Sequence, residues 1–272
     1  MKVMQKLFSL TMLIAAAVFV QGCARKGVPG NIDVSKLSGY LASRPENTPA
    51  EAYHIKVTGL TAANYKSIRD ALVTNPSKYV DLSATKLPDG ITNMDNCFKD
   101  CTALVMPPEI PDSVTGMYAC FLGCTSLVQS PEIPRNAVDM AHCFADCTSL
   151  KKPPVIPHDV GDMSFCFNGC KSLIQAPEIP NSARDMSGCF KGCTALIQAP
   201  VIPGHVNNMG ICFEGCTSLK NVQILTEECS LWGYCFRDCT AIERIEVPNK
   251  DIRTVIYSAI GNESVKGKIK AR

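Results

Sequence analysis

The sequence predicts an α/β fold, a right-handed solenoid of about seven 23-residue coils with a cap at each end. Three observations support this prediction: a cysteine motif recurs at a fixed spacing, apolar columns recur in step with it, and prolines follow most copies at the same distance. A single coil of this length cannot bury its apolar side, but stacked coils bury a continuous core between neighbours. The repeat therefore overrides the one or two ordinary domains that 272 residues would otherwise suggest.

The cysteine motif is the strongest of these signals. Fourteen of the 16 cysteines form Cys-Phe-x-x-Cys pairs, and the pairs follow one another with an unbroken 23-residue period. The pairs are Cys97/Cys101, Cys120/Cys124, Cys143/Cys147, Cys166/Cys170, Cys189/Cys193, Cys212/Cys216 and Cys235/Cys239. Seven copies at one period exclude a chance arrangement.

Other residue types repeat in step with the cysteines. A leucine stands at a fixed place shortly after the second cysteine of each pair, and an isoleucine follows inside a Pro-x-Ile-Pro motif in five copies. The leucine column consists of Leu104, Leu127, Leu150, Leu173, Leu196 and Leu219, with Ile242 in the last copy. A period of about 20–29 residues with leucine at a fixed place is typical of leucine-rich-repeat solenoids.

Each coil is expected to combine three short pieces. In the second copy, four residues stand at positions i, i+3, i+4 and i+7: Met117, Cys120, Phe121 and Cys124. This spacing predicts one face of a short helix. Residues 126–129 then form a short extended segment that ends before the following prolines, because proline has no amide hydrogen for a sheet ladder.

The pattern Cys-Phe-x-Gly-Cys-Thr-Ser-Leu, followed by Pro-Glu-Ile-Pro, resembles the treponemal-type, BspA-like leucine-rich repeats of surface proteins from oral and gut anaerobes. The resemblance covers roughly residues 78–248. The commoner form of that repeat has alanine at the first cysteine and lacks the extra residue found here in copies one to five. The resemblance implies a curved solenoid on the cell surface. It implies adhesion or protein recognition only loosely, because one fold hosts many functions.

The N-terminus has the composition of a lipoprotein signal peptide over residues 1–22. Two lysines precede an apolar run over residues 7–20, which is shorter than the roughly 20 residues of a membrane-spanning helix. The run ends in Gln21-Gly22-Cys23, which resembles a lipobox, although Gln21 departs from the usual small residue. We expect Cys23 to carry the lipid that anchors the chain in the membrane. The alternative is an ordinary signal peptide cut nearby.

The remaining chain divides into four predicted parts. Residues 23–50 are expected to form a flexible tether, 51–90 an N-terminal cap with half a repeat, 91–248 the repeats, and 249–272 a C-terminal cap helix with a basic tail.

Each flank carries its own element signals. Residues 53–57 alternate as a strand, and residues 62–74 read as a helix. Residues 251–260 predict a helix with Ile252, Val255, Ile256 and Ile260 inward, followed by Gly261 as its C-cap. The basic tail of Lys266, Lys268, Lys270 and Arg272 is expected to be solvated.

Charge and motifs exclude several function classes. Removing residues 1–22 leaves 25 basic and 25 acidic residues, so the mature chain lacks the basic excess of nucleic-acid-binding proteins. The cysteine pairs fall within zinc-ligand spacing, but they share a face with phenylalanine and methionine, so we expect no metal. No catalytic grouping and no cofactor motif is found, and the four histidines occupy non-equivalent positions that are expected to face solvent.

We expect the repeat cysteines to be buried, unpaired thiols, because free cysteine behaves as a small apolar residue. Cross-coil disulfides stay open as an alternative, since stacked strands lie about 4.8 Å apart. With Cys23 lipidated, 15 cysteines remain, and an odd number cannot pair completely within one chain.

A candidate binding face follows from the two residues after each core leucine, which should point outward and form two parallel rows. These residues are Val105, Met106, Val128, Gln129, Lys151, Lys152, Ile174, Gln175, Ile197, Gln198, Lys220 and Asn221, with Glu243 and Arg244 in the last copy. The rows are more apolar than a purely solvated face, which favours an interaction site. The alternative is that β-branched residues simply suit a pleated surface.

Three hypotheses for function are compatible with the sequence. The leading one is a non-enzymatic, lipid-anchored protein of the bacterial cell envelope, at the outer membrane or cell surface, that binds a protein or extracellular-matrix partner. The second is a structural envelope lipoprotein without a specific ligand. The third is a redox or metal-handling protein that uses the cysteine ladder.

Overall fold

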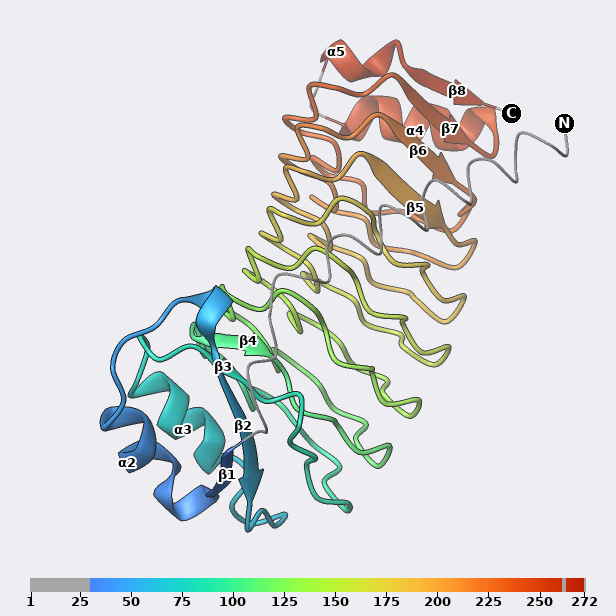
Figure 1. The fold of residues 1–272 in the computed structure, drawn as a ribbon. Coiled ribbons are helices and arrows are strands. Elements are labelled where there is room, and N and C mark those ends of the chain that lie inside the picture. Colours follow the sequence, from blue (N-terminus) through green and yellow to red (C-terminus); the bar gives the residue numbers. More distant parts are fainter. Residues whose placement is uncertain (1–29, 261–262, 272) are drawn as a thin grey trace, which may run out of the picture.

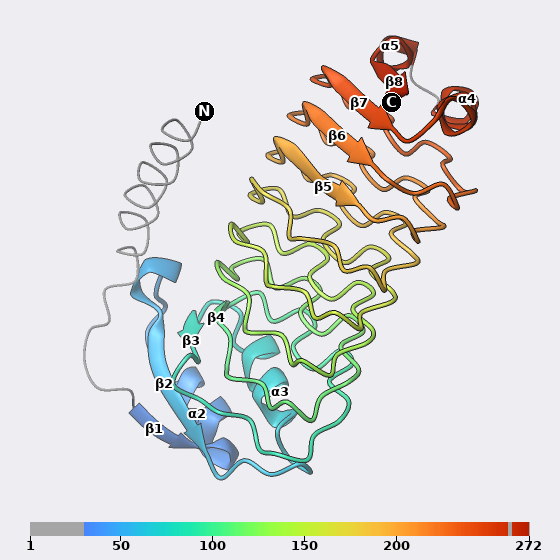
Figure 2. The ribbon, with the colours of Figure 1, turned by 90° about the vertical axis from the view of Figure 1, so that its right-hand side faces the viewer.

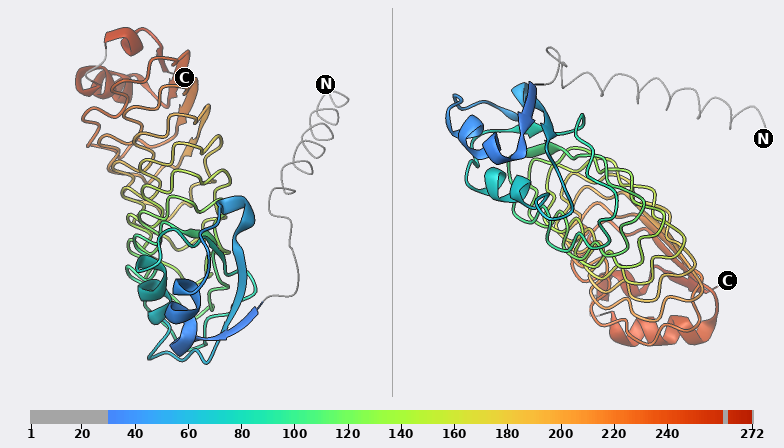
Figure 3. Two further views of the ribbon diagram at one scale, coloured as in Figure 1. Left: turned by 60° about the vertical axis from the view of Figure 1, so that its left-hand side comes forward. Right: turned by 90° about the horizontal axis from the view of Figure 1, so that it is seen from below.

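The computed structural model describes residues 30–260 and 263–271. The coils stack into one elongated body between an N-terminal and a C-terminal cap (Figure 1). Two four-stranded parallel sheets lie in the orders β1-β2-β3-β4 and β5-β6-β7-β8, and Figure 3 shows the same stack from two further sides. The predictions for the signal peptide, for Cys23 and for Gly261 lie outside the described residues.

The 23-residue period is the register of the stack. Isolated parallel bridges join Asn93 to Gly116, Gly116 to Asp139, and Asp139 to Asp162, and the series continues through Asp185 and Asn208 to Leu231. Each step advances by one period of the sequence repeat and places equivalent positions of neighbouring coils side by side. The structure therefore confirms a leucine-rich-repeat solenoid with parallel strands.

The helix predicted in each coil is wrong. The segment from the methionine to the second cysteine of each coil, here called the turn ladder, is a chain of tight turns. In the second coil the N–H groups of Ala119, Phe121 and Gly123 donate to carbonyls of the next coil, at 2.9, 2.8 and 2.8 Å. An α-helix would direct these groups to carbonyls one helical turn earlier in its own segment. The i, i+3, i+4, i+7 spacing thus identified the inward side chains but not the backbone.

Left-handed backbone conformations make the turn ladder possible. Two positions in each coil have φ between 50° and 74°, the residues before the first and before the second cysteine. The first column is Asn96, Ala119, His142, Phe165, Gly188, Ile211 and Tyr234, and the second is Asp100, Gly123, Asp146, Gly169, Gly192, Gly215 and Asp238. Glycine and aspartate tolerate this conformation better than most residues. The second column holds only glycine and aspartate, whereas five of the seven positions in the first column hold Ala, His, Phe, Ile or Tyr.

Strands form where proline allows them. In the later coils β5 spans Gln198–Ile202, β6 Asn221–Ile224 and β7 Arg244–Val247. The β5–β6 register shifts on either side of Pro200, whereas β6 and β7 contain no proline and pair without interruption. Copies two to four carry a Pro-x-Ile-Pro motif and keep single bridges such as Gln129–Lys152, as expected for a residue that cannot donate to the ladder. Copy five carries the same motif but still forms β5, with the shifted register.

The core is a set of stacked columns. The phenylalanine rings from Phe98 to Phe236 are nearly parallel, with 5.3–5.7 Å between successive centroids, and all are buried. The fourteen cysteines of the Cys-Phe-x-x-Cys motifs flank the rings, and they are buried free thiols, as predicted. The second cysteine of a pair also donates its thiol hydrogen to the phenylalanine carbonyl of the preceding coil, as Cys124 does to Phe98 at 3.0 Å.

The N-terminal cap starts earlier than predicted. Residues 30–51 are not a tether, because they fold into β1 (Gly30–Asp33), η2 (Val34–Lys36), α2 (Leu37–Ala42) and η3 (Pro49–Glu51). Leu37 and Leu41, one helical turn apart, are fully buried. Their apolar signal is too short to stand out against the surrounding glycines and prolines. β1 then pairs in parallel with the next strand, which joins the segment to the sheet.

The rest of this cap follows the prediction more closely. β2 (Tyr53–Thr58) confirms the alternating strand, with Ile55 and Val57 buried. α3 (Ser67–Val73) is shorter than the predicted helix because the preceding residues form turns. β3 (Val80–Asp81) and β4 (Leu104–Met106) complete the first sheet.

The C-terminal cap differs in its tail. α4 (Lys250–Ala259) confirms the helix and buries Ile252 and Ile256, but Val255 is exposed rather than inward. The tail is not a free solvated end, since α5 (Glu263–Lys266) leads into β8 (Ile269–Ala271) and β8 pairs with β7. Covering the open edge of the last coil protects its backbone groups from pairing with another chain. Within the described residues, no helix is long and apolar enough to cross a membrane.

Candidate binding surface

The strand side of the solenoid carries a row of residues at one repeat position, joined in three paired groups. Backbone pairing connects His54 to Asp81 and Asp81 to Met106 at the N-terminal end. Further pairs join Gln129 to Lys152, Gln175 to Gln198, Gln198 to Asn221 and Asn221 to Arg244. This set of residues is called the register row below. Its members Gln198, Asn221 and Arg244 begin strands β5, β6 and β7, which lie side by side in Figure 2.

A second row lies beside it, made of the first residue after each core leucine. Backbone hydrogen bonds link its members from coil to coil, for example Ile197 N–H to the Ile174 carbonyl at 3.3 Å and Lys220 N–H to the Ile197 carbonyl at 2.9 Å. We call it the corner row: Val105, Val128, Lys151, Ile174, Ile197, Lys220 and Glu243. The structure therefore places the predicted site residues in two adjacent columns.

Exposure varies along the two rows. Most predicted residues are exposed: Gln129, Lys151, Lys152, Ile174, Gln175, Ile197, Gln198, Lys220 and Asn221. Met106 and Val128 are half-buried. Val105 was predicted to face outward, but it is 1% exposed. It lies in the middle of β4, between strand β3 of the N-terminal cap and the next coil, so the cap closes this end of the surface.

Apolar exposure concentrates in the middle and later coils. Ile174 and Ile197 are 50% and 47% exposed and occupy adjacent coils. Val155 and Val201, at the x position of Pro-x-Ile-Pro, are also exposed, Val155 to 90%. Sequence reasoning overlooked these two valines, although the buried isoleucine beside each of them was a signal that the preceding residue points outward.

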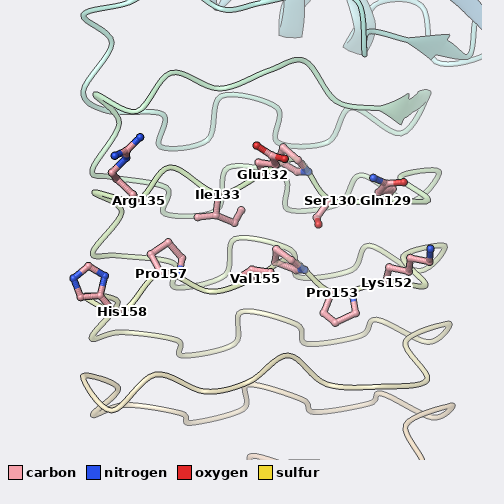
Figure 4. Close-up of a pocket in the computed structure, with 12 residues that line it drawn as sticks. Gln129, Ser130, Glu132, Ile133, Arg135, Lys152, Pro153, Val155, Pro157 and His158 are labelled. Carbon is pink, nitrogen blue, oxygen red and sulfur yellow. The ribbon is translucent and has the colours of Figure 1, made fainter. Parts of the chain in front are cut away.

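A groove runs between two neighbouring coils beside the register row (Figure 4). Prolines and two apolar residues, Ile133 and Val155, line its middle. Gln129 and Lys152 lie at one end, and Arg135 and His158 at the other.

Several charges on this side are paired. Arg135 contacts Asp112 at 2.6 Å across neighbouring coils, and Lys220 contacts Glu243 at 3.3 Å. Such exposed pairs contribute little to stability, about 0–1 kcal/mol each. The ion pairs therefore contribute less to this surface than its exposed apolar and amide side chains do.

The cysteines of the described residues are poor nucleophiles and poor metal ligands. Burial raises the pKa of Cys97, Cys229 and Cys239 to about 12, and it raises the pKa of the more deeply buried thiols above their usual range as well. The thiolate is the nucleophile and the metal ligand, so thiols held protonated are inert. No group of three or more His, Cys, Asp or Glu residues in the described chain is placed to hold a metal ion.

The prediction that all four histidines face solvent is wrong for two of them. His54 is half-buried and contacts Asp81 at 3.2 Å in the register row, and His142 is half-buried against Phe165. His158 and His205 are exposed. His54 joined the row without any sequence signal, because the spacing within the N-terminal cap departs from the period of the repeats.

Comparison with known proteins identifies the family of the repeats. The model of the BspA type leucine rich repeat region matches in six copies, over residues 77–162 and 140–266. A leucine-rich-repeat protein of T. pallidum is 28% identical with a TM-score of 0.52, covering 68% of this chain and 84% of that one. One from Bacteroides ovatus is 17% identical with a TM-score of 0.31, covering 91% and 84%. A search of proteins with curated functions finds no match.

The family match agrees with the geometry of the repeats, and it extends over more than half of the chain. Leucine-rich-repeat proteins generally serve as scaffolds for protein interaction, and BspA-type members are associated with bacterial surfaces. The chain belongs to the BspA-type leucine-rich-repeat family.

Proposed function

We propose that this protein is a lipid-anchored surface protein that binds a protein or extracellular-matrix partner through the corner and register rows of its strand side. The observation that carries the proposal is the exposure of Ile174 and Ile197 in adjacent coils, beside a row of amide side chains. Contiguous exposed apolar residues with a polar rim are a common feature of interaction sites.

The surface suits an extended partner. Stacked coils repeat the same two positions along the axis, which gives an elongated contact area rather than a pocket. Gln175, Gln198 and Asn221 offer amide donors and acceptors next to the isoleucines. A partner could bury the isoleucines and satisfy the amides at once, which is how protein interfaces combine apolar cores with hydrogen bonds.

The lipid on Cys23 would hold this surface close to the membrane. Gly30, where β1 begins, stands seven positions after Cys23, so the connection spans at most about 25 Å. Anchoring at the outer membrane or cell surface would present the solenoid to extracellular partners.

A paired substitution tests the binding surface. Ile174→Asp with Ile197→Asp should weaken binding to immobilised matrix proteins and to intact host cells by at least tenfold, with the melting temperature nearly unchanged. Val73→Asp with Val255→Asp is the matched control, because these cap residues are 39% and 40% exposed and the charge change is the same. Its binding should equal that of the wild type.

The other outcomes point elsewhere. A much lower melting temperature in Ile174→Asp/Ile197→Asp would show that these side chains belong to the core. Unchanged stability and binding would place any partner on another face. A wild-type protein that is displayed on cells yet binds none of the probes would favour a structural spacer.

A further inference from the structure

We propose that the turn-ladder side carries a second recognition surface, an aromatic shelf flanked by carboxylates, that binds a lysine- or arginine-rich segment of a partner protein. The shelf consists of Tyr118, His142 and Phe165, which come from three successive coils. It lies on the turn ladder rather than on the strand side, so it is independent of the surface proposed above.

The three rings form one continuous group. His142 stacks on Phe165 with 4.9 Å between ring centroids and an interplanar angle of 6°, and Tyr118 meets His142 edge-on at 5.7 Å. Tyr118 is 43% exposed, and the other two rings are half-buried. An ideal Cβ on Gly188 would lie 2.5 Å from the Phe165 ring, so this ring extends over the backbone of the following coil.

Local backbone preference does not explain why aromatic residues stand here. His142 and Phe165 have φ of 56° and 53°, a region that side chains with a Cβ occupy at a cost. Gly188 and Asn96 occupy the same column and suit the same conformation better. Ala119, Ile211 and Tyr234 share this conformation, so the positive φ belongs to the whole column. What distinguishes the shelf is that aromatic side chains from successive coils meet there.

Carboxylates stand at repeat positions before and after the first left-handed column, which holds His142 and Phe165. Asp139, Asp162 and Asp185 occupy one repeat position just before the first left-handed column, Asp95 lies close to the same position of the first coil, and Asp100 and Asp146 stand in the second left-handed column. Asp139, Asp162 and Asp185 each accept a nearby backbone N–H at 2.7–2.9 Å, which fixes their direction. Among the described residues, none of these carboxylates forms an ion pair with Lys, Arg or His.

The aspartates at this repeat position repel one another electrostatically. Burial raises the pKa of Asp139, and the neighbouring charges of Asp162 and Asp95 raise it further, against the lowering effect of the hydrogen bond from the Ala141 N–H. Lys191, which stands on the same ladder, is held by Glu214 at 3.2 Å. A bound cation would relieve the repulsion among the aspartates.

Aromatic rings and carboxylates together select a cationic ligand. A lysine ammonium or arginine guanidinium is attracted to a ring within about 6 Å of its centroid, and neighbouring carboxylates add a complementary field. An anionic or apolar segment would leave the carboxylates without compensation. Charge complementarity therefore identifies the occupant as a basic peptide segment.

The test uses a fluorescein-labelled peptide of alternating lysine and glycine, with the glutamate–glycine peptide as its negative counterpart, titrated against the folded protein by fluorescence anisotropy. Tyr118→Ser with Phe165→Gly should weaken binding on the order of tenfold, since each exposed ring–cation contact is worth about fivefold. Glycine suits the left-handed backbone, so the melting temperature should not fall. His142→Asn, which places the residue of the first coil in this column, should weaken binding as well.

Charge is tested separately from the rings. Asp162→Asn with Asp185→Asn should weaken binding more than Glu132→Gln with Glu178→Gln, two acids on the return side of the coils. Equal binding in wild type and in both ring variants would overturn the proposal, as would an equal effect of the two acid pairs. Ile174→Asp with Ile197→Asp should leave this binding unchanged, so failure of one surface does not decide the other.

Discussion

The thiol of Cys147 donates a hydrogen bond of 3.1 Å to the backbone carbonyl of Phe121 in the preceding coil. The same bond recurs from Cys124 to Cys239, at 2.9–3.2 Å. It explains why the second position of each Cys-Phe-x-x-Cys pair holds cysteine rather than another small apolar residue, because the thiol both fills space and donates to a buried carbonyl.

Cys147→Ala is expected to destabilise the protein by about 1–3 kcal/mol, since it removes a buried side chain and one hydrogen bond. Cys147→Ser keeps a donor at the same place and should lose less. Chemical denaturation measures both. Serine that is worse than alanine would show that packing, and not the hydrogen bond, determines the residue.

Thiol accessibility provides the second prediction. In the folded protein at mildly alkaline pH, the fifteen described cysteines should react slowly with a thiol reagent, because all are buried and held protonated. After denaturation without reductant, the titration should find about fifteen groups. A result of one or two groups would establish cross-coil disulfides instead.

Alkaline pH should unfold the protein. Burial raises the pKa of Cys97 to about 12, above the value near 9 of an exposed thiol. The stability from burying protonated thiols is therefore complete below about pH 9 and is lost as pH rises toward the folded pKa, at about 1.4 kcal/mol per pH unit for each thiol. The denaturation midpoint should fall steeply between about pH 8.5 and about pH 10.5. A variant with alanine at Cys120, Cys143 and Cys166 should show a shallower fall, and an identical slope would assign the effect to other groups.

Glycine at position 188 is required by two features at once. Its φ of 59° disfavours any Cβ, and an ideal Cβ would lie 2.5 Å from the Phe165 ring. Gly188→Ala should lower stability by about 1–3 kcal/mol. Gly204→Ala is the matched control, because no atom lies within 4 Å of its ideal Cβ and its φ is not positive. Equal melting temperatures for the two variants would contradict the ring placement.

Lipidation of Cys23 is tested in the producing cell. Cys23→Ala should abolish incorporation of labelled palmitate and leave the precursor uncleaved by the lipoprotein peptidase. The protein should then leave the membrane fraction, because no other anchor is proposed. Cys229→Ala serves as the control, since this cysteine is buried near the C-terminal end of the repeats. Unchanged palmitate labelling in Cys23→Ala would reject the assignment.

Part of the candidate surface could be predicted from sequence. Ile174 and Ile197 follow a core leucine at a fixed distance, so their exposure was readable from the repeat. Val105 occupies the same position and was misplaced, because its burial depends on a cap whose sequence does not share the period of the coils. The aromatic shelf was missed for a related reason: Tyr118 and His142 stand at different repeat positions and meet only across coils.

The sequence by itself determined the period, the order of the coils and the identity of the inward columns. These follow from the spacing of apolar side chains, which is local information repeated seven times. Only the tertiary structure decided the path of the backbone. Phe121 donates its N–H to the carbonyl of Cys143 in the next coil rather than into a helix of its own segment. This hydrogen bond needs a carbonyl of the neighbouring coil. Local propensity cannot predict it, because the acceptor is in place only after the coils have stacked.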